Sequence, residues 1–243
     1  IAAGLNYAIE GQPYGVFRGT FAAKDDEGNR LINPETGKII FSDDLGLEDE
    51  IIGDPNEDWR LTNINTFSYK GLSLNIQWEY IHGGDIFSLT ASNLLRRGVT
   101  KDTEDRERSF IIPGVLADPN SGTPLVDGSG NKIPNNIQIG ANDLYFINLQ
   151  DVDENLIYDA SVIRLRDVSL SYSLPKRLLD QTFFGSVVFT LSGNNLWYET
   201  PNIPKHLNLD PEVLSSGVGN GKGLDFQNDP SYKQYSFGVK LTF

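Results

Sequence analysis

Residues 72–80 read Leu72-Ser73-Leu74-Asn75-Ile76-Gln77-Trp78-Glu79-Tyr80. Apolar and polar side chains alternate through this stretch without a break. Because successive side chains of a β-strand point to opposite faces of the sheet, one face of this strand is apolar and the other is polar. The stretch therefore predicts a β-strand that separates an apolar environment from a polar one.

The same alternation recurs along the chain. Clear runs cover 168–174, 187–191 and 235–243, and weaker runs cover 14–21 and 61–69. This period of two outweighs the spacing of three and four that indicates helices. The sequence therefore predicts an all-β fold with six antiparallel strands, at about 5–22, 59–69, 72–92, 156–174, 183–196 and 232–243.

The connections between the expected strands alternate in length. Long stretches at 23–58, 93–155 and 197–231 are separated by short ones near 69–71 and 175–182. In an up-and-down meander, all the long connections then lie at one end of the sheet and all the short ones at the other. This asymmetry is typical of transmembrane β-barrels, which have long outer loops and short periplasmic turns, and it is unusual in compact soluble domains.

The negative charge of the chain is concentrated in the long connections. The 33 acidic and 20 basic residues give a formal net charge of −13. The stretches 23–58, 93–155 and 197–231 hold 12, 10 and 5 acidic residues against 3, 6 and 2 basic ones. We therefore expect nearly neutral strands and an acidic, solvated loop surface. The acidic surplus excludes a nucleic-acid-binding surface, which needs an excess of Lys and Arg.

Other features of the composition narrow the class of protein further. The absence of cysteine excludes a disulfide framework, thiolate metal sites and a cysteine nucleophile. No apolar run reaches the 18 or so residues of a membrane-spanning helix, and we expect no signal peptide within these residues. The chain begins at Ile1 and contains no Met, so we expect it to be a mature or trimmed piece of a longer protein.

Aromatic residues gather near the ends of the expected strands, on their apolar faces. Examples are Tyr69, Tyr80, Tyr172, Tyr235 and Phe243. A soluble sandwich would fill its core mainly with Val, Ile and Leu, whereas a membrane barrel carries an aromatic girdle at each interface. The distribution favours a barrel wall.

One stretch resembles a family signature. Residues 163–175 read Ile163-Arg164-Leu165-Arg166-Asp167-Val168-Ser169-Leu170-Ser171-Tyr172-Ser173-Leu174-Pro175. They match the pattern RL-x-x-V-x-L-x-Y-x-L-P near the end of SusC/RagA-type TonB-dependent outer-membrane transporters. Further matches follow the family order at 53–59, 65–71, 83–86, 191–197, 210–212 and 235–243. The resemblance spans about residues 11–243, with Asn194 in a segment where the family often carries Arg.

The resemblance implies a particular architecture and location. Transporters of this family have a barrel of about 22 strands, an N-terminal plug and a periplasmic segment that contacts TonB. The chain would supply the last six strands, with long extracellular loops, in the outer membrane of a Gram-negative, Bacteroidetes-like bacterium. Its neighbours there would be outer-membrane lipid, the remaining barrel strands and the plug.

The resemblance also implies a function and partners. A SusD-like surface lipoprotein would capture glycans or peptides, and TonB-ExbB-ExbD would drive their import through the N-terminal region that this chain lacks. The terminal strand resembles the signal that the outer-membrane assembly machinery reads. Its residues are Tyr235, Phe237, Val239, Leu241 and Phe243.

Four aromatic residues in or beside the long loops are candidates for contact with substrate or partner. They are Trp59, Tyr145, Trp197 and Tyr198. Their rings are able to stack on sugar faces, but anchoring at a membrane interface or packing within a loop is the favoured interpretation for each of them. On the polar faces of the strands, Asn75, Gln77, Glu79 and Lys240 are expected to line the barrel wall.

No catalytic residue and no cofactor are expected. The two histidines, His82 and His206, lie on different segments, and no G-x-S-x-G motif is present. The glycine-rich stretch 217–223 lacks the strand-loop-helix context of a phosphate site and is interpreted as a loop.

A partial calcium-loop pattern occurs at 151–155. Asp151, Asp153 and Asn155 are spaced as the first three ligands of such a loop. Leu156 stands where the loop needs Gly, and Val162 stands where it needs a bidentate Glu. A structural calcium ion there is a minor alternative to a solvated loop.

Two other classes of protein remain open from the sequence. The chain is also compatible with a soluble, secreted β-rich carbohydrate-binding or adhesion module, and less so with a small outer-membrane enzyme barrel. The apolar strand faces discriminate between the first two classes. They form an outward belt about 25 Å tall in a barrel, but pack against each other in a sandwich.

Overall fold

The computed structural model describes residues 2–3, 5–145, 152–214 and 221–243. They form two compact units, each assembled from several passages of the chain. We call them the loop unit (1–56, 84–159 and 203–228) and the sheet unit (57–83, 160–202 and 229–243). Strands predominate in the described chain and helices are few, in agreement with the predicted all-β class.

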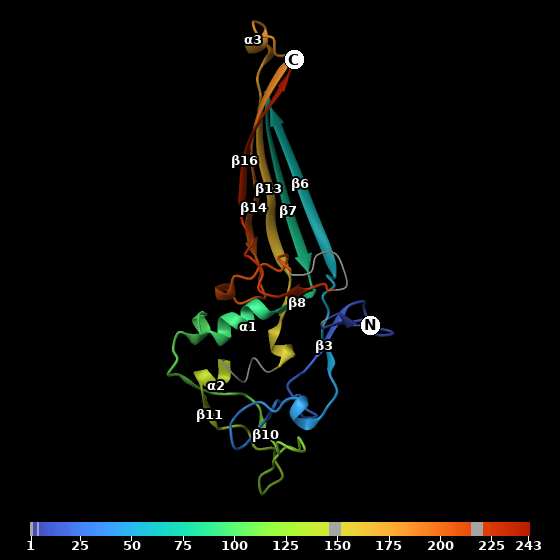
Figure 1. Ribbon diagram of the computed structural model, residues 1–243, viewed down its shortest axis with the longest axis vertical. Helices are drawn as coiled ribbons and strands as arrows, with labels where there is room; N and C mark the ends of the chain where they lie inside the picture. The colour runs from blue at the N-terminus through green and yellow to red at the C-terminus, as the bar shows by residue number, and fades with distance from the viewer. Residues whose placement is uncertain (1, 4, 146–151, 215–220) are drawn as a thin grey trace. The chain divides into compact units, whose positions relative to one another are not determined.

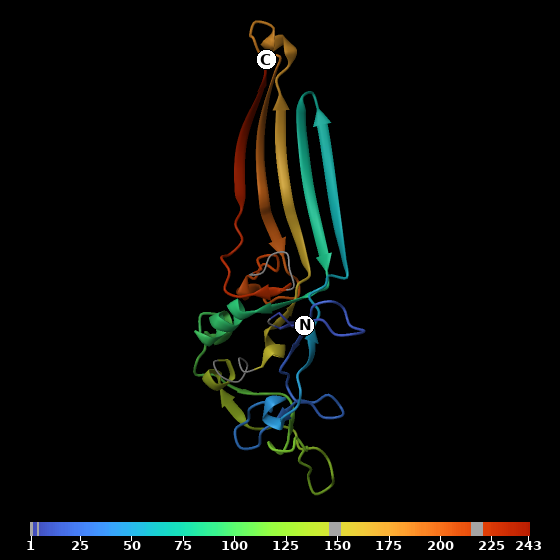
Figure 2. The same cartoon turned by 45° about the vertical axis from the view of Figure 1, so that its right-hand side comes forward.

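The sheet unit consists of one five-stranded antiparallel sheet (Figures 1 and 2). The strands lie in the order β16-β14-β13-β7-β6. Their bounds are β6 (Trp59–Tyr69), β7 (Leu72–His82), β13 (Val162–Ser173), β14 (Ser186–Glu199) and β16 (Gln234–Thr242). Each strand pairs with its neighbour in chain order, so the sheet is an up-and-down meander.

Short connections join the strands at one end of this sheet. Between β6 and β7, Lys70 and Gly71 both have positive φ, of 45° and 86°, as the tightest hairpin turns require. A side chain at Gly71 would lie 2.7 Å from the carbonyl oxygen of Ser173, so glycine also permits a close approach to β13. Between β13 and β14, the chain forms the single turn of helix α3 (Lys176–Leu179).

A β-bulge at Arg166 changes the phase of β13. Leu165 pairs with Trp78 of β7, and Asp167 pairs with Gln77, which leaves Arg166 as the extra residue. An extra residue in a strand shifts every later side chain to the opposite face. Strict alternation would place Arg164 and Arg166 on the same face as Val168 and Leu170. With the bulge, Arg164 and Leu165 exchange faces, and the apolar face continues through Leu165.

The loop unit contains short strands in four small sheets, ordered β1-β2-β3-β5, β10-β4, β11-β9 and β12-β8-β15. The strand bounds are β1 (Ala2–Ala3), β2 (Asn6–Tyr7), β3 (Val16–Gly19), β4 (Leu31–Ile32), β5 (Glu50–Gly53), β8 (Asp85–Ser88), β9 (Ser109–Ile111), β10 (Val115–Leu116), β11 (Gln138–Gly140), β12 (Ile157–Asp159) and β15 (Leu224–Asp225). The helices are α1 (Leu89–Arg96), α2 (Ala141–Tyr145) and single 3₁₀ turns at Asp43–Leu45, Lys101–Thr103, Asp153–Leu156 and Lys205–Leu207.

The long connections have apolar cores of their own. One cluster includes Ile32, Phe41 and Ile112, and another includes Leu31 and Ile40. All five of these side chains are buried. The long connections are therefore packed structure, whereas the sequence predicted only a solvated surface.

The first expected strand, 5–22, does not join the five-stranded sheet. This segment contains β2 and β3, which pair with each other, and β3 also pairs with β5 of the loop unit. Val16 and Phe17 are adjacent in sequence and therefore point to opposite faces of the strand. Both are buried, so this strand is covered on both faces. Gly11 and Gly15, both with positive φ, interrupt the segment. The sheet therefore has five of the six strands predicted.

Two other expected strands are shorter in the sheet than predicted. The strand expected at 72–92 ends at His82, because Gly83 and Gly84 both take positive φ. Beyond them, Ser88 caps helix α1, since its hydroxyl accepts a hydrogen bond of 3.0 Å from the amide of Ala91. The strand expected at 156–174 begins in the sheet only at Val162.

Lys132 connects two turns of the loop unit that are far apart in sequence. Its ammonium group lies 2.8 Å from Asp25, 2.5 Å from Asp26 and 3.2 Å from Glu27. The hydrogen bond from Lys132 holds the pKa of the Asp25 carboxyl well below its usual range, and that of Asp26 below it too. The same contacts raise the pKa of Lys132. This ion cluster ties the first long connection to the second.

Replacing Lys132 with Gln will loosen both turns. We expect amide hydrogen exchange in residues 25–31 and 127–132 to become severalfold faster, because three carboxylates lose their common partner. The pKa values of Asp25 and Asp26 are lower in the folded state than in the unfolded state, so the cluster stabilises the fold at neutral pH. This stabilisation is lost as the pH falls from the ordinary Asp pKa of 3.8 towards the lower pKa values of the folded state.

Hydrogen exchange measured by mass spectrometry on the wild type and the variant checks this prediction. The control is Lys38→Gln, because the ammonium group of Lys38 lies 3.8 Å from Asp143 in an exposed pair. Equal exchange in the two variants would show that the cluster does not stabilise the turns.

Candidate functional site

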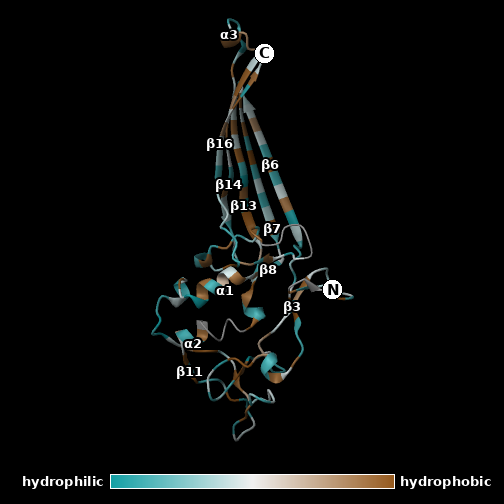
Figure 3. Cartoon of the chain, viewed as in Figure 1, coloured by the Kyte–Doolittle hydropathy of each residue, from teal (hydrophilic) through white to brown (hydrophobic). Residues whose placement is uncertain are grey.

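The two faces of the five-stranded sheet differ sharply in character, as the alternating colours along its strands show (Figure 3). Cross-strand pairing places Leu74, Leu170 and Leu191 on one face, together with Phe237. We call this the apolar face. Its side chains are exposed to a large degree, with Leu191 58% and Phe237 69% accessible. In the described chain it is therefore a broad apolar surface.

Asn63 and Asn65 are exceptions on the apolar face. They lie opposite Trp78 and Ile76 in the register of β6 and β7. The side-chain amide of Asn65 donates a hydrogen bond to the side-chain oxygen of Asn63. The two asparagines are thus polar partners of each other on an otherwise apolar face.

Aromatic rings mark both ends of the apolar face. At the long-connection end, Trp59 contacts Tyr80 edge to face, with ring centroids 4.9 Å apart, and Trp78 contacts Trp197 at 6.1 Å. At the short-turn end, the rings of Phe183, Phe184 and Phe243 form a cluster, and Tyr69 and Tyr172 are exposed.

The spacing of these aromatic rows matches a membrane. Tyr80 and Leu72, which pairs with Tyr172, are eight positions apart along β7. At about 3.3 Å per residue, the rows are roughly 26 Å apart. A tilted strand that crosses an outer membrane has about 9–11 residues. The apolar face therefore has nearly the strand length, and the aromatic borders, of a lipid-facing surface.

The opposite face of the sheet is polar. We call it the polar face. Cross-strand partners along it are Ser68 with Ser73, Thr66 with Asn75, Ser171 with Thr190, and Ser192 with Ser236, and each pair is hydrogen-bonded through its side chains. Lys240 lies on this face opposite Val188. The sheet therefore presents a ladder of hydroxyl and amide groups on one side and hydrocarbon on the other.

An ion network occupies the polar face near its long-connection end. The carboxylate of Glu79, 7% exposed, lies 3.1 Å from Arg60 and accepts a 2.7 Å hydrogen bond from Nε of Arg166. Arg60 also contacts Glu57 at 2.8 Å. The bulge makes this network possible, because it brings Arg166 onto the polar face beside β7. Four charged side chains from three neighbouring segments thus interlock on one face.

The candidate contact residues lie in different settings. Trp59 and Trp197 belong to the aromatic row at the long-connection end of the apolar face. Tyr198 lies on the polar face, where the guanidinium carbon of Arg164 is 5.3 Å from its ring centroid. Tyr145 ends helix α2, and its side chain lies outside the described residues. The structure thus places Trp59 and Trp197 where interface anchors occur, and their contact with substrate or partner stays a prediction.

The terminal strand β16 carries the predicted assembly residues on a single face. Tyr235, Phe237, Val239 and Leu241 pair in turn with Gly193, Leu191, Phe189 and Val187. Phe243 follows the strand, and its ring stacks on that of Phe183 at 5.8 Å. Recognition of this strand by an assembly machinery stays a prediction.

Within the partial calcium-loop pattern, the side chain of Asp153 is used for internal bonding. Both the amide and the hydroxyl of Thr20 donate to the carboxylate of Asp153 at 3.1 Å. Asp151 lies outside the described residues. Among the described residues, no group of three or more His, Cys, Asp or Glu side chains is arranged to hold a metal ion. A calcium ion at this position stays an untested alternative.

The two histidines belong to different units. His82 lies 3.8 Å from Asp58 and packs against the ring of Trp59 in the sheet unit. His206 bonds to Asp102 in the loop unit. Neither arrangement offers a nucleophile beside a base.

Within the described chain, no helix is both long and apolar enough to cross a membrane.

Sequence reasoning missed the ion network on the polar face, although it placed Glu79 there. The signal available was a conflict of phase. Arg164 and Arg166 are separated from Val168 and Leu170 by even numbers of positions. A straight strand would therefore put both arginines on the apolar face. Such a conflict indicates a bulge between the charged and the apolar residues.

Comparison with known proteins identifies similar chains, although no family model matches. The chain is 24% identical over 229 residues to TonB-dependent receptor P3 of Formosa agariphila, covering 92% of this chain and 20% of the relative. It is 25% identical over 230 residues to TonB-dependent receptor P26 of the same organism, covering 89% of this chain and 20% of the relative. The chain thus spans about a fifth of the length of these curated relatives.

A solved structure shares the fold. The RagAB peptide importer in its open-open state superposes with a TM-score of 0.54 at 22% identity, covering 99% of this chain and 24% of that one. The names of the relatives describe receptors and an importer rather than enzymes. The family resemblance drawn from the sequence motifs is confirmed.

Replacing Glu79 with Gln will destabilise the sheet unit. The change leaves Arg60 and Arg166 without their shared carboxylate. Removing one partner of a buried ion pair costs about 3–5 kcal/mol, and the partial exposure of both arginines lowers our expectation to about 2 kcal/mol. Denaturant unfolding of the protein measures the change.

The matched control for this measurement is Glu57→Gln. It removes the exposed partner of Arg60, for which we expect a loss of about 0.5 kcal/mol or less. If Glu57→Gln costs as much as Glu79→Gln, the network on the polar face is not the stabilising element.

Proposed function

We propose that this chain, which is similar to TonB-dependent receptors over nine tenths of its length, forms part of the transmembrane barrel wall of an outer-membrane nutrient importer. Its sheet separates lipid from the barrel interior, with the apolar face towards lipid. The loop unit supplies the extracellular surface. The chain performs no catalysis itself.

The single observation that carries this proposal is the exposure of the apolar face. Contiguous apolar patches on soluble monomers rarely exceed a few hundred Å², because water disfavours larger ones. Here Leu61, Phe67, Leu170, Leu191 and Phe237 are all more than 40% exposed on one sheet. In a soluble sandwich these residues would be the buried core. In a barrel they contact lipid, so the proposal accounts for their exposure.

The edges of the sheet support an incomplete barrel. Within the described chain, β6 pairs only with β7, and β16 pairs only with β14. Unpaired backbone groups in lipid cost several kcal/mol each, so both edges need further strands. The curated relatives, of which this chain spans a fifth, are long enough to supply them. By the family resemblance, the closed barrel would have about 22 strands.

The polar face is suited to the barrel interior. Its hydroxyl ladder and its ion network present hydrogen-bonding groups that water or the plug domain is able to satisfy. Import would be driven by TonB-ExbB-ExbD through parts of the receptor outside this chain. A SusD-like lipoprotein would bind at the extracellular side.

The substrate follows less directly from this chain. The family resemblance implies glycans or peptides, and the solved neighbour is named a peptide importer. Peptides are therefore the first class to test. Disruption of the gene should abolish growth on the imported class alone, and a complementing copy should restore it only in a cell with functional TonB.

Growth of the disrupted strain on peptide mixtures and on oligosaccharides as sole carbon source measures this. We expect at least a tenfold loss of uptake for one class, because such molecules are too large to pass a porin. Unchanged growth and uptake on both classes would overturn the import function.

The orientation of the sheet gives a second test. Val168 lies midway between the two aromatic rows, opposite Ile76. If its face contacts lipid, Val168→Lys should cost about 2–4 kcal/mol, as a cation at the bilayer midplane does. Folding of the receptor into vesicles, followed by denaturant titration, measures the cost.

Ser169→Lys is the matched control. Ser169 is the next residue of the same strand and faces the polar side, opposite Asn75. We expect it to change stability by less than about 1 kcal/mol, since a lumenal lysine keeps access to water. The reverse order of the two effects would mean that the sheet faces the other way.

A further inference from the structure

Three cations gather at the short-turn end of the sheet. Lys70 forms the β6–β7 turn, and Lys176 and Arg177 begin helix α3 between β13 and β14. All three side chains are exposed. In the connecting stretches 69–72 and 173–186, Asp180 is the one acidic residue. We call Lys70, Lys176 and Arg177 the turn cations.

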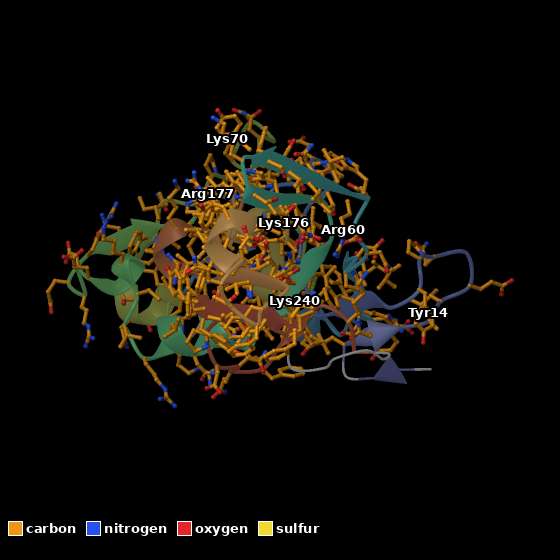
Figure 4. The ribbon with its side chains drawn as sticks, turned by 90° about the horizontal axis from the view of Figure 1, so that it is seen from above. Tyr14, Arg60, Lys70, Lys176, Arg177 and Lys240 are labelled. Carbon is orange, nitrogen blue, oxygen red and sulfur yellow. The ribbon has the colours of Figure 1, made fainter. Side chains whose placement is uncertain are left out.

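The fold brings the two turns together. The amide of Ser173 donates a 2.8 Å hydrogen bond to the carbonyl of Gly71, so the β6–β7 turn adjoins the end of β13. Lys176 follows three residues later, and Asp180 caps its carbonyl at 3.0 Å. Figure 4 looks onto this end of the sheet and labels the turn cations. Cations about a hundred positions apart in sequence thus lie on adjoining turns.

Exposed apolar side chains surround the turn cations. Tyr69, Leu178, Phe183 and Phe243 are 70%, 57%, 74% and 80% exposed. The ammonium group of Lys70 lies 5.1 Å from the ring centroid of Tyr69, on the apolar face. In membranes, aromatic rings lie at the level of the headgroups, and lysine and arginine extend past them into the polar layer. The turn cations are therefore placed at the height of lipid phosphates.

We propose that the turn cations bind the phosphate groups of anionic glycerophospholipids in the leaflet that meets the short-turn end. The inference rests on the proposed barrel function. Charge complementarity and continuity with the apolar face identify this occupant: the acyl chains lie along the apolar face, and the phosphate meets the cations. The fork of donors on Arg177 suits a phosphate, which it is able to bind with two hydrogen bonds. Bound lipid would hold this sector of the wall at a defined depth.

Lipid retention by the complete receptor tests the proposal. The receptor is reconstituted into bilayers of phosphatidylcholine and phosphatidylglycerol, released with detergent and weighed with its bound lipids by native mass spectrometry. Each cation near an anionic surface contributes roughly fivefold to binding. Substituting Gln for all three turn cations should therefore weaken phosphatidylglycerol binding by about a hundredfold. Raised salt should weaken the wild type in the same direction.

Two single variants form a matched pair. Arg177→Gln should lower phosphatidylglycerol retention severalfold. Lys240→Gln also removes one positive charge near the short-turn end of the sheet. Lys240 lies on the polar face, opposite Val188, so this variant should leave retention unchanged. Folding is read separately, from the shift in electrophoretic mobility that a closed barrel shows before heating. The single variants keep the test valid if the triple variant folds poorly.

The outcomes separate the two proposals. Loss of retention in the turn variants but not in Lys240→Gln supports the lipid site. Equal retention in all variants that fold into the bilayer overturns the lipid site and leaves the barrel function intact. Displacement of the lipid by millimolar inorganic phosphate would also overturn it, since the cluster would then be a phosphate site. Failure of the wild type to insert into any bilayer would overturn the barrel function itself.

Discussion

The bulge at Arg166 keeps the two faces of the sheet chemically separate. Without the extra residue, Arg164 and Arg166 would point to the same side as Val168 and Leu170, and two cations would enter the apolar face. With it, Arg166 reaches Glu79 on the polar face, and Leu165 takes its place beside Trp78. A surface that contacts lipid tolerates few unpaired charges, so the other features of the sheet depend on this one change of phase.

The sheet and the loops are stabilised in different ways. The sheet has a single layer, and its strands are held by their ladders of hydrogen bonds and by cross-strand side-chain pairs. The loop unit instead buries apolar residues such as Ile32 and Phe17 in small cores of its own. Lys132 adds a salt-bridge cluster between two of its turns. A sheet of this kind needs surroundings that cover its apolar face, whereas the loop unit supplies its own interior.

The sheet divides the proposed roles between its two faces and its two ends. In the proposed function, the apolar face and its aromatic rows contact the bilayer. The polar face, with its network around Glu79, offers a surface for water and the plug. The long connections carry most of the acidic residues, and the short turns carry the turn cations.

Several elements followed from local pattern alone. Alternation predicted β6 with its observed bounds and the cores of β7, β13, β14 and β16, because a strand that divides two environments must alternate. Positive φ at Gly83 and Gly84 ended β7 earlier than the alternation suggested. The segment 5–22 also looked like a strand of the sheet. Its pairing with β5 depends on a partner about thirty residues away, which no local pattern identifies.

The sequence by itself determined the alternation of the strands, their two unlike faces, the acidic loops and the resemblance to TonB-dependent transporters. Each of these is a property of neighbouring residues or of a short motif. Only the tertiary structure decided the bulge at Arg166, the partners of Glu79 and Lys132, and the grouping of Lys70 with Arg177. These features join residues distant in the chain. Strand register and loop packing bring such residues together, and neither is encoded in the spacing of adjacent side chains.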